Sequence, residues 1–255
     1  MTVRYRVECA ADAIEARAQA LAVEQSVEMP IEAVRDARVR AEVVGEVLGI
    51  DPLPGPPQRF DVVLALAAET VGDEPGQLMN MLFGNCSLQP DVALLDVQLP
   101  DAMLERLPGP RFGIDGWRAA VGAAGRRALS CTALKPQGLS AGALADLAYA
   151  FARAGIDVIK DDHGLADQPA APFAQRVPAV QRAIARANRE KSHDGGALAG
   201  HRSVYAPSLS GGPRRLAAQL GIVCDEGVGA ALACPMIVGV PAFVELVRDE
   251  AAVPL

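Results

Sequence analysis

The sequence predicts an α/β protein with two domains: an N-terminal α+β (ferredoxin-like) domain over residues 1–126, then about the first half of a (β/α)8 TIM-type barrel over residues 127–255. Three observations lead to this prediction. Long alternating runs typical of antiparallel strands fill the N-terminal half. After a Gly- and Pro-rich segment, short apolar runs alternate with amphipathic helical segments, as in a parallel sheet. A hydrophobic content of 51% over 255 residues allows a packed core and excludes a disordered chain.

The sequence pattern of the N-terminal half predicts a strand, a helix, two long strands, a helix and a strand, in that order. Residues 4–10 alternate as a half-buried strand does, and residues 11–25 have the 3.6-residue rhythm of an amphipathic helix. The two long strands are separated by the turn sequence DPLPGPP, which can continue neither. The expected elements after residue 25 are strands over 38–50 and 59–67, a helix over 76–82 and a strand over 92–99. We therefore expect helices on one face of an antiparallel sheet.

The C-terminal half predicts four successive strand–helix units after a linker over residues 107–127. The expected strands are 129–134, 156–160, 203–206 and 229–235, and the expected helices are 140–154, 173–189, 213–220 and 241–250. Residues 252–255 are predicted to begin a fifth strand. In barrels of this kind the chemistry lies at the carboxyl ends of the strands, so polar residues directly after strands are the candidates for a site.

Charge and composition exclude several classes of function. With 24 Lys and Arg against 31 Asp and Glu, the net charge of -7 argues against nucleic-acid binding and against an anionic membrane surface. The N-terminus has no apolar signal segment, and the longest apolar run is too short and too broken by Gly and Pro to span a bilayer. Five widely spaced cysteines fit reduced thiols better than disulfides or a zinc site. We therefore predict a cytoplasmic protein.

The sequence Lys-Asp-Asp-His at residues 160–163 follows the second barrel-type strand. Crowded like charges at a strand end are unfavourable unless a cation is present, and carboxylates are ligands that Mg²⁺ prefers. Strand alternation places Asp162 on the same side as Lys160, with Asp161 and His163 on the other unless the strand ends there. The alternative is a structural loop in which an Asp caps the next helix and Lys160 pairs with Asp161.

Lys135, in the sequence LSCTALKPQGLS, follows the first barrel-type strand and is expected to point into the same mouth as Lys160. A lysine here can act as an acid or a base in proton transfer. The alternative is a lysine that simply reaches solvent at a strand end. Two lysines at consecutive strand ends favour the functional interpretation.

The chain resembles the RuBisCO large-chain superfamily and, within it, the non-carboxylating RuBisCO-like proteins (form IV). The resemblance covers nearly all of the 255 residues and rests on motifs in the family's order: YRVE, ALAVEQSVEMP, LMNMLFGNCSL, LPGPRFGIDGWR, CTALKPQGLS, GIDVIKDDHGLADQP and YAPSLSG. The most specific of these are KPQGLS and KDDHGLADQP. The family's fold is an α+β domain followed by a (β/α)8 barrel, which agrees with the fold predicted above.

The resemblance implies that Lys160 is carbamylated by CO₂ and binds Mg²⁺ together with two acidic residues. Asp162 matches the first acidic ligand, and His163 stands at the position of the second. Imidazole binds divalent ions but suits softer metals than Mg²⁺. Lys135 matches the family's catalytic lysine on the first barrel strand.

The resemblance also implies contributions from the N-terminal domain. Asn85 matches an asparagine that reaches into the site of the partner subunit, and Glu24 matches a substrate-binding glutamate of that domain, so the family's organisation is a homodimer with shared active sites. Two residues depart from the family pattern. Gln137 replaces the second lysine of a Lys-Pro-Lys element, and Met29 replaces a threonine that contacts a substrate phosphate.

The function implied is Mg-dependent enolisation or isomerisation, or related lyase chemistry, of a phosphorylated sugar or sugar acid. One alternative is a truncated, non-catalytic pseudo-enzyme or assembly partner. A second alternative is ribulose-bisphosphate carboxylase, against which Gln137 argues. Because the pattern stops where a fifth strand would begin, we expect the 255-residue chain alone to be inactive and to associate through the apolar stretch 227–246.

Overall fold

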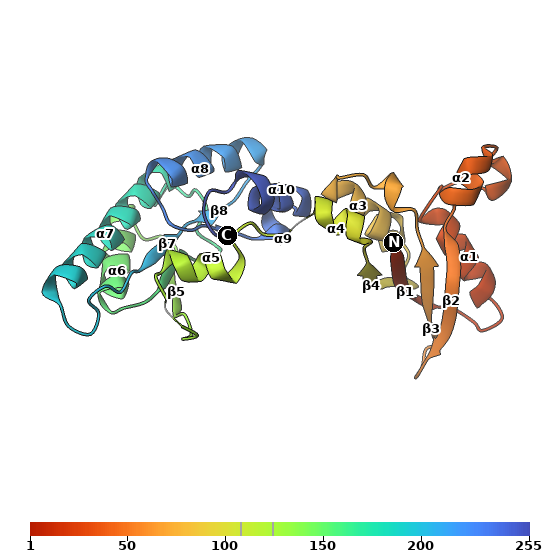
Figure 1. The fold of residues 1–255 in the computed structure, drawn as a ribbon, viewed down its shortest axis with the longest axis horizontal. Helices are drawn as coiled ribbons and strands as arrows, with labels where there is room; N and C mark the ends of the chain where they lie inside the picture. Colours follow the sequence, from red (N-terminus) through yellow and green to blue (C-terminus); the bar gives the residue numbers. More distant parts are fainter. Residues whose placement is uncertain (108, 124) are drawn as a thin grey trace. The chain divides into compact units, whose positions relative to one another are not determined.

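A computed structural model describes residues 1–107, 109–123 and 125–255, and it divides the chain into two compact units (Figure 1). The first unit is Met1–Pro108 and the second is Gly109–Leu255. The sequence placed the division at residue 126. The difference arises because helix α5 (Gly113–Ala120) belongs to the second unit, where Trp117 and Ala120 pack beside Val158 and Val204.

The first unit is built on a four-stranded antiparallel sheet in the order β2-β3-β1-β4. Alternation in β1 buries Val3, Tyr5 and Val7 on one face. The same face of β3 buries Val62 and Leu64, so the sheet carries a continuous apolar side. The strands are β1 (Thr2–Glu8), β2 (Glu46–Leu53), β3 (Arg59–Ala65) and β4 (Val92–Gln98).

Helices of the first unit complete this core. Helix α1 (Ile14–Glu24) buries Ile14, Ala18 and Leu21, and α3 (Pro75–Phe83) buries Met81 and Leu82 in the same cluster. The remaining helical segments are η1 (Ile31–Ala33), α2 (Ala37–Glu42), η2 (Ala68–Thr70), η3 (Asn85–Leu88) and α4 (Asp101–Arg106). The predicted α+β architecture is thereby confirmed.

One strand prediction is wrong at its start. Residues 38–42, expected in a long strand, lie in helix α2. The Asp36 carboxylate accepts hydrogen bonds from the backbone N–H groups of Arg38 at 2.8 Å and Val39 at 3.1 Å, which is a helix N-cap. The β-branched residues in this stretch suggested a strand, but the cap and the following turn decided the local structure.

The second unit contains a parallel sheet in the order β5-β6-β7, formed by β5 (Cys131–Leu134), β6 (Val158–Asp161) and β7 (Val204–Ala206). Pro207 interrupts the chain after β7, and a second parallel pair joins β8 (Ser208–Leu209) to β9 (Leu232–Ala233). Besides α5, the described helices of this unit are α6 (Ala141–Arg153), α7 (Phe173–Asp194), α8 (Pro213–Asp225), α9 (Pro235–Val238), α10 (Val240–Glu245) and the π-helical η4 (Leu246–Glu250). The predicted repetition of strand and helix is confirmed.

Two further expectations differ from the structure. The segment 107–127, expected as a linker, contains α5. A hydrogen bond of 3.2 Å from Trp117 Nε1 to the Leu255 carbonyl holds this helix in the second unit. Residues 252–255 are not a strand, although the Pro254 carbonyl accepts a hydrogen bond from Ala231 N–H. Short apolar segments do not specify a strand without a partner to pair with.

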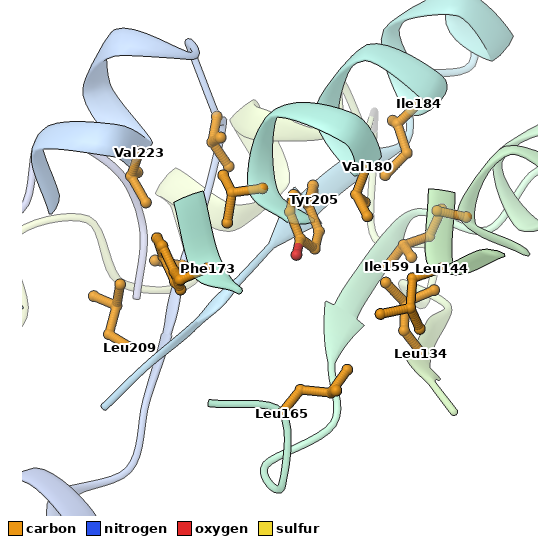
Figure 2. Packing of buried hydrophobic residues seen from close by; sticks show 14 of the residues in the cluster. Leu134, Leu144, Ile159, Leu165, Phe173, Val180, Ile184, Tyr205, Leu209 and Val223 are labelled. Carbon is orange, nitrogen blue, oxygen red and sulfur yellow. The ribbon is translucent and has the colours of Figure 1, made fainter. Parts of the chain in front are cut away.

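The core of the second unit lies between its sheets and the helices that cover them (Figure 2). Helix α7 presents Val180 and Ile184 to this core, and Tyr205 of β7 lies beneath it. Ile159 of β6 and Leu134 of β5 are fully buried in the same cluster. This packing fixes the strands β5, β6 and β7 against α6 and α7, and thereby fixes the loops that leave the carboxyl ends of the strands.

Candidate active site

The carboxyl ends of the adjacent parallel strands β5 and β6 bring Lys135 and Asp162 together. Lys135 follows β5 directly, and Asp162 follows β6 directly. Their Nζ and Oδ1 atoms lie 2.9 Å apart in an ion pair. The Lys135 side chain is 61% exposed, whereas the Asp162 side chain is only 9% exposed. The Asp162 carboxylate is thus held by the fold, and it positions the Lys135 ammonium where a small molecule can reach it.

The charge of Asp162 is stabilised by this contact. The hydrogen bond from Lys135 is the largest influence, and it lowers the pKa of the Asp162 carboxyl below its usual range. Burial opposes this change, and the positive charge of Lys135 supports it. The Asp162 carboxylate is thus favoured as an anion, and its ion pair orients Lys135.

Lys160 lies on the same side of β6 as Asp162, as strand alternation predicts, because Asp161 between them points the other way into the core. Its Nζ donates to the backbone carbonyl of Asp161 at 3.2 Å. The side chain borders an open hollow of about 240 Å³ whose other walls are almost entirely apolar: Trp117, Leu129, Cys131, Val158, Ala206, Ala231 and Leu232.

His163 stands beside Asp162 at the start of the following loop. Its side chain is largely exposed, and Nδ1 lies 3.5 Å from Asp162 Oδ1. Ligand atoms at adjacent positions on a divalent ion are about 3 Å apart, so these two donors are spaced to share one ion. Among the described residues, no group of three His, Cys, Asp or Glu side chains is placed to hold a metal. The residues therefore fit a divalent ion only if Lys160, as a carbamate, adds a third donor.

The contacts of residues 160–163 agree only in part with the structural alternative. The first backbone N–H of α7, that of Phe173, is bound by the Asp167 carboxylate at 2.8 Å and not by Asp161 or Asp162. Lys160 contacts the backbone carbonyl of Asp161, because the Asp161 carboxylate is paired with Arg176. Burial raises the pKa of Asp161 most strongly, while the Arg176 charge and the hydrogen bond from Tyr205 act in the opposite direction.

A second contact joins the two loops of the site. Gln137, two residues after Lys135, lies directly over the backbone of Gly164, two residues after Asp162. A Cβ atom at position 164 would lie 1.6 Å from Gln137 Nε2, so any other residue at this position would displace the Gln137 amide. The exposed amide of Gln137 thus lies at the start of the loop that follows Asp162.

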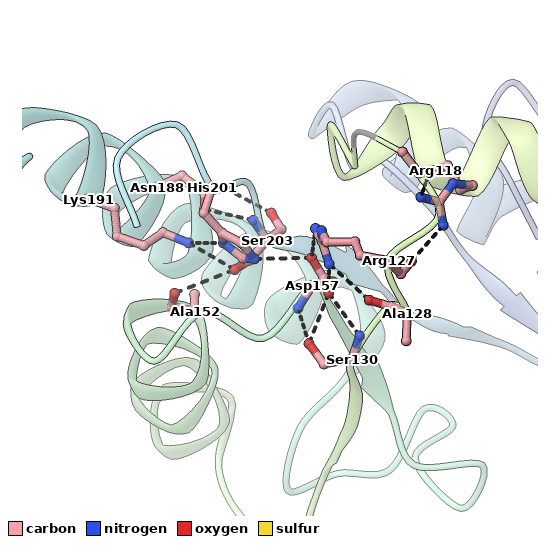
Figure 3. Close-up of polar contacts among 11 residues, drawn as sticks. Arg118, Arg127, Ala128, Ser130, Ala152, Asp157, Asn188, Lys191, His201 and Ser203 are labelled. Carbon is pink, nitrogen blue, oxygen red and sulfur yellow. Dashed lines mark hydrogen bonds and ion pairs between the residues drawn. The ribbon is translucent and has the colours of Figure 1, made fainter. Parts of the chain in front are cut away.

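The opposite, amino end of β6 holds a polar network that the sequence did not indicate (Figure 3). Asp157 accepts two hydrogen bonds from Arg127, at 2.7 and 2.8 Å, and another from the Ser130 backbone. His201, to which the sequence assigned no role, lies between Asp157 and the buried Lys191. Its Nδ1 is 2.9 Å from Lys191 Nζ and its Nε2 is 3.1 Å from Asp157 Oδ1, so the lysine donates to the ring and the ring donates to the carboxylate. Burial lowers the pKa of Lys191.

The position of this polar network at the amino end of β6 argues against a catalytic role. In barrel-type sheets, residues at the amino ends of strands serve stability, and catalytic residues lie at the carboxyl ends. The Asp157 network therefore anchors β6, and the Lys135–Asp162 pair is the functional candidate.

Glu24 and Asn85, the two candidates from the N-terminal domain, belong to the first unit. Glu24 is the last residue of α1, and Asn85 is the first residue of η3, where both side chains are half-buried. The structure thus brings Lys135, Asp162 and His163 together in the second unit, with Lys160 two residues before Asp162 on β6. The roles of all six candidate residues stay predictions.

Charged residues at the carboxyl ends of parallel strands are typical of enzymes with a (β/α)8 barrel. Comparison with known proteins identifies the family. Residues 113–201 match the family model for the ribulose bisphosphate carboxylase large chain, catalytic domain. The chain belongs to the RuBisCO large-chain family, within its RuBisCO-like proteins.

The relatives are similar over almost the whole chain. RuBisCO-like protein 1 of Rhodopseudomonas palustris is 51% identical over 98% of this chain and 64% of its own length. The 5-methylthioribulose-1-phosphate isomerase of Rhodospirillum rubrum is 49% identical over 96% of this chain and 63% of its own length. The chain therefore spans slightly less than two thirds of these two relatives.

Solved structures agree with the fold. The crystal structure of a RuBisCO-like protein from Rhodopseudomonas palustris has a TM-score of 0.86 and 48% identity, covering 99% of this chain and 67% of that one. A RuBisCO-like protein from Alicyclobacillus acidocaldarius has a TM-score of 0.85 and 26% identity, covering 99% and 62%. Across the described parts of the chain, every helix is too short or too polar to cross a membrane.

Proposed function

We propose that the full-length protein isomerises a phosphorylated five-carbon ketose by moving a proton between carbons next to a carbonyl group, with 5-methylthioribulose 1-phosphate as the substrate. The observation that carries the proposal is the 2.9 Å pair of Lys135 and Asp162 at the carboxyl ends of β5 and β6. The name of the Rhodospirillum rubrum relative, an isomerase 49% identical to this chain, supports the substrate. More distant relatives named as enolases of a diketo-methylthiopentyl phosphate support the same kind of proton chemistry.

Proton transfer next to a carbonyl needs two functions. One group must remove the proton from carbon, and another must stabilise the negative oxygen of the enediolate that forms. Lys135 suits the second function, because its ammonium is oriented by Asp162 and is exposed to a substrate. The same ammonium can return a proton to the oxygen. Lys160, on the same face, is assigned the first function in its carbamylated form.

Carbamylation changes what Lys160 can do. A neutral amine that adds CO₂ and loses a proton becomes an anion with two acceptor oxygens, which suits a base or a metal ligand. Asp162, His163 and carbamylated Lys160 would hold a divalent ion such as Mg²⁺. When bound, the ion would stabilise negative charge on the substrate oxygen. The RuBisCO-like pattern supports this assignment, and the 3.5 Å spacing of the Asp162 and His163 donor atoms is compatible with it.

Carboxylation of ribulose bisphosphate is the less favoured function. The position of the family's second lysine holds Gln137, whose neutral amide lies over Gly164. One cation fewer at this position provides less stabilisation for a substrate with two phosphate groups. We further propose a homodimer in the cytoplasm, in which Asn85 and Glu24 contribute to substrate binding.

The experiment is to incubate the full-length protein with 5-methylthioribulose 1-phosphate, Mg²⁺ and bicarbonate, and to follow the products by ¹H and ³¹P NMR. The proposal predicts conversion to an isomer of unchanged mass. A parallel incubation with ribulose bisphosphate and labelled CO₂ should fix no label. Label fixation, or an unchanged first substrate, would refute the proposed reaction.

A further inference from the structure

A fully buried ion pair lies directly behind the candidate site. The Asp161 carboxylate and the Arg176 guanidinium are both 0% exposed. Arg176 Nε and one terminal nitrogen lie 3.1 and 3.0 Å from Asp161 Oδ2. Arg176 belongs to the apolar stripe of α7, between Phe173 and Val177. A charge in such a stripe must be matched by partners, because an unpaired buried charge is strongly destabilising.

Arg176 also holds the loop that carries the site at two points. Its terminal nitrogens donate to the carbonyl of Ala166 at 2.8 Å and to that of Ala171 at 2.6 Å. Within the loop, Leu165 N–H donates to the Asp162 carbonyl at 2.8 Å, and Gln168 Nε2 donates to the Gly164 carbonyl at 2.6 Å. Residues 162–172 are therefore a cross-linked segment fastened to one guanidinium.

Asp161 extends these bonds to the neighbouring strands. Its Oδ1 accepts from the Tyr205 hydroxyl at 2.7 Å, and its Oδ2 accepts from Ser208 N–H at 3.0 Å. Residues of β6, β7 and β8 thus meet at one carboxylate. Since Lys160 and Asp162 flank Asp161 on the opposite face of the chain, the anchor behind the strand sets the direction of both side chains.

We propose that Arg176 is a positioning residue that, through Asp161 and the two loop carbonyls, holds Asp162 in contact with Lys135. Apolar residues of similar volume can replace a buried ion pair without loss of stability, so stability alone does not require this pair. The planar guanidinium instead provides several directed hydrogen bonds at once, which a lysine cannot do. The catalytic consequence rests on the proposed function, whereas the effect on the Lys135–Asp162 contact does not.

The test uses the small number of amines in the chain. Lysine occurs only at positions 135, 160 and 191. A zero-length carbodiimide reagent joins an amine to a carboxylate only where the two are in contact, so a peptide linking Lys135 to Asp162 reports their pairing. Hydrogen–deuterium exchange of residues 163–171 reports the order of the loop.

The variant is Arg176→Lys, and its matched control is Arg127→Lys, which disturbs an arginine–aspartate pair at the other end of the same strand. We expect Arg176→Lys to lose most of the Lys135–Asp162 cross-link and to exchange the loop amides at least about tenfold faster. We expect Arg127→Lys to keep both at wild-type level. With 5-methylthioribulose 1-phosphate, Arg176→Lys should lower kcat at least about tenfold and change KM by less than about threefold.

A melting temperature that falls in both variants, with cross-link, loop exchange and kcat kept in Arg176→Lys, would overturn the proposal and leave Arg176 a structural residue. If Arg176→Lys does not fold, the Lys135–Asp162 cross-link is measured in Tyr205→Phe instead. This variant removes one hydrogen bond to Asp161 and leaves the ion pair in place. Partial loss of the cross-link supports the proposal, and an unchanged yield overturns it. If the wild type does not turn over the substrate, the proposed function fails while the cross-link and exchange still decide the positioning role.

Discussion

Lys135 and Asp162 meet at 2.9 Å although they leave different strands and are separated by a whole helix, α6. The contact follows from the register of the parallel sheet, in which Leu134 pairs with Asp161. The next residue of each strand is therefore brought to the same edge. A cation that follows one strand and an anion that follows its neighbour form the candidate active site.

Metal binding should depend on Asp162 and, less strongly, on His163. In buffer containing bicarbonate, calorimetry should detect binding of Mg²⁺ or Mn²⁺ to the wild type and no binding to Asp162→Asn. Loss of the imidazole in His163→Ala should weaken binding at least about tenfold. The control is His193→Ala, whose side chain is 94% exposed at the end of α7. Equal affinity in all four proteins would show that residues 160–163 do not hold the metal.

Substitution of Gly164 should displace the Gln137 amide and leave the fold intact. Gly164→Ala places a methyl group against Gln137 Nε2, which is the far end of an exposed side chain and can move away, so we expect a loss of at most about 0.5 kcal/mol in the free energy of unfolding. In a Gln137→Ala background the same substitution meets no amide and should be nearly neutral. Urea denaturation of the four proteins measures both effects. A loss of more than about 1 kcal/mol in Gly164→Ala alone would contradict a mobile Gln137 amide.

The stability of the second unit should fall in acid because of Asp157. The hydrogen bonds from Arg127 hold the pKa of the Asp157 carboxyl well below its usual range. A carboxyl whose pKa is lower in the folded state stabilises the protein above its unfolded pKa of about 3.9, and this contribution is lost as the pH falls further. Asp157→Asn should therefore unfold more easily than the wild type at pH 7, by about 2–3 kcal/mol, and the difference should shrink at pH 3.

Thermal melts from pH 7 to pH 3 measure this effect. The control is Asp194→Asn, which changes an exposed carboxylate at the end of α7 and should shift all melts by a small, similar amount. A difference between Asp157→Asn and the wild type that is constant with pH would contradict the assignment.

Local patterns in the sequence predicted much of this site. Alternation along β6 separates Lys160 and Asp162 from Asp161, and the structure has this arrangement. Apolar periodicity also located α6 and α7 within a few residues. These features depend on spacing along one segment, which a sequence displays directly.

Contacts between segments could not be predicted in the same way. Arg176 interrupts the apolar stripe of α7, and this was the available signal for a buried charge, but its partner Asp161 is 15 residues away in the chain. The link from Asp157 to His201 spans 44 residues. Residues 38–42, expected in a strand, lie in helix α2, whose amino end is capped by the Asp36 side chain. Each of these outcomes depends on a partner or a cap that propensity and periodicity do not specify.

Exchange of the transferred substrate proton with solvent tests the catalytic role of the Lys135–Asp162 pair most directly. It reports proton abstraction without requiring the complete reaction. The full-length wild type, incubated in D₂O with 5-methylthioribulose 1-phosphate, should incorporate deuterium next to the carbonyl carbon. Lys135→Met should reduce the rate at least about 100-fold and keep the melting temperature within about 4 °C, since the lysine side chain is mostly exposed. Arg182→Met, a change of an exposed cation on α7, should exchange at the wild-type rate. Deuterium incorporation by Lys135→Met at the wild-type rate would contradict the assignment of Lys135 and Asp162 as the active site.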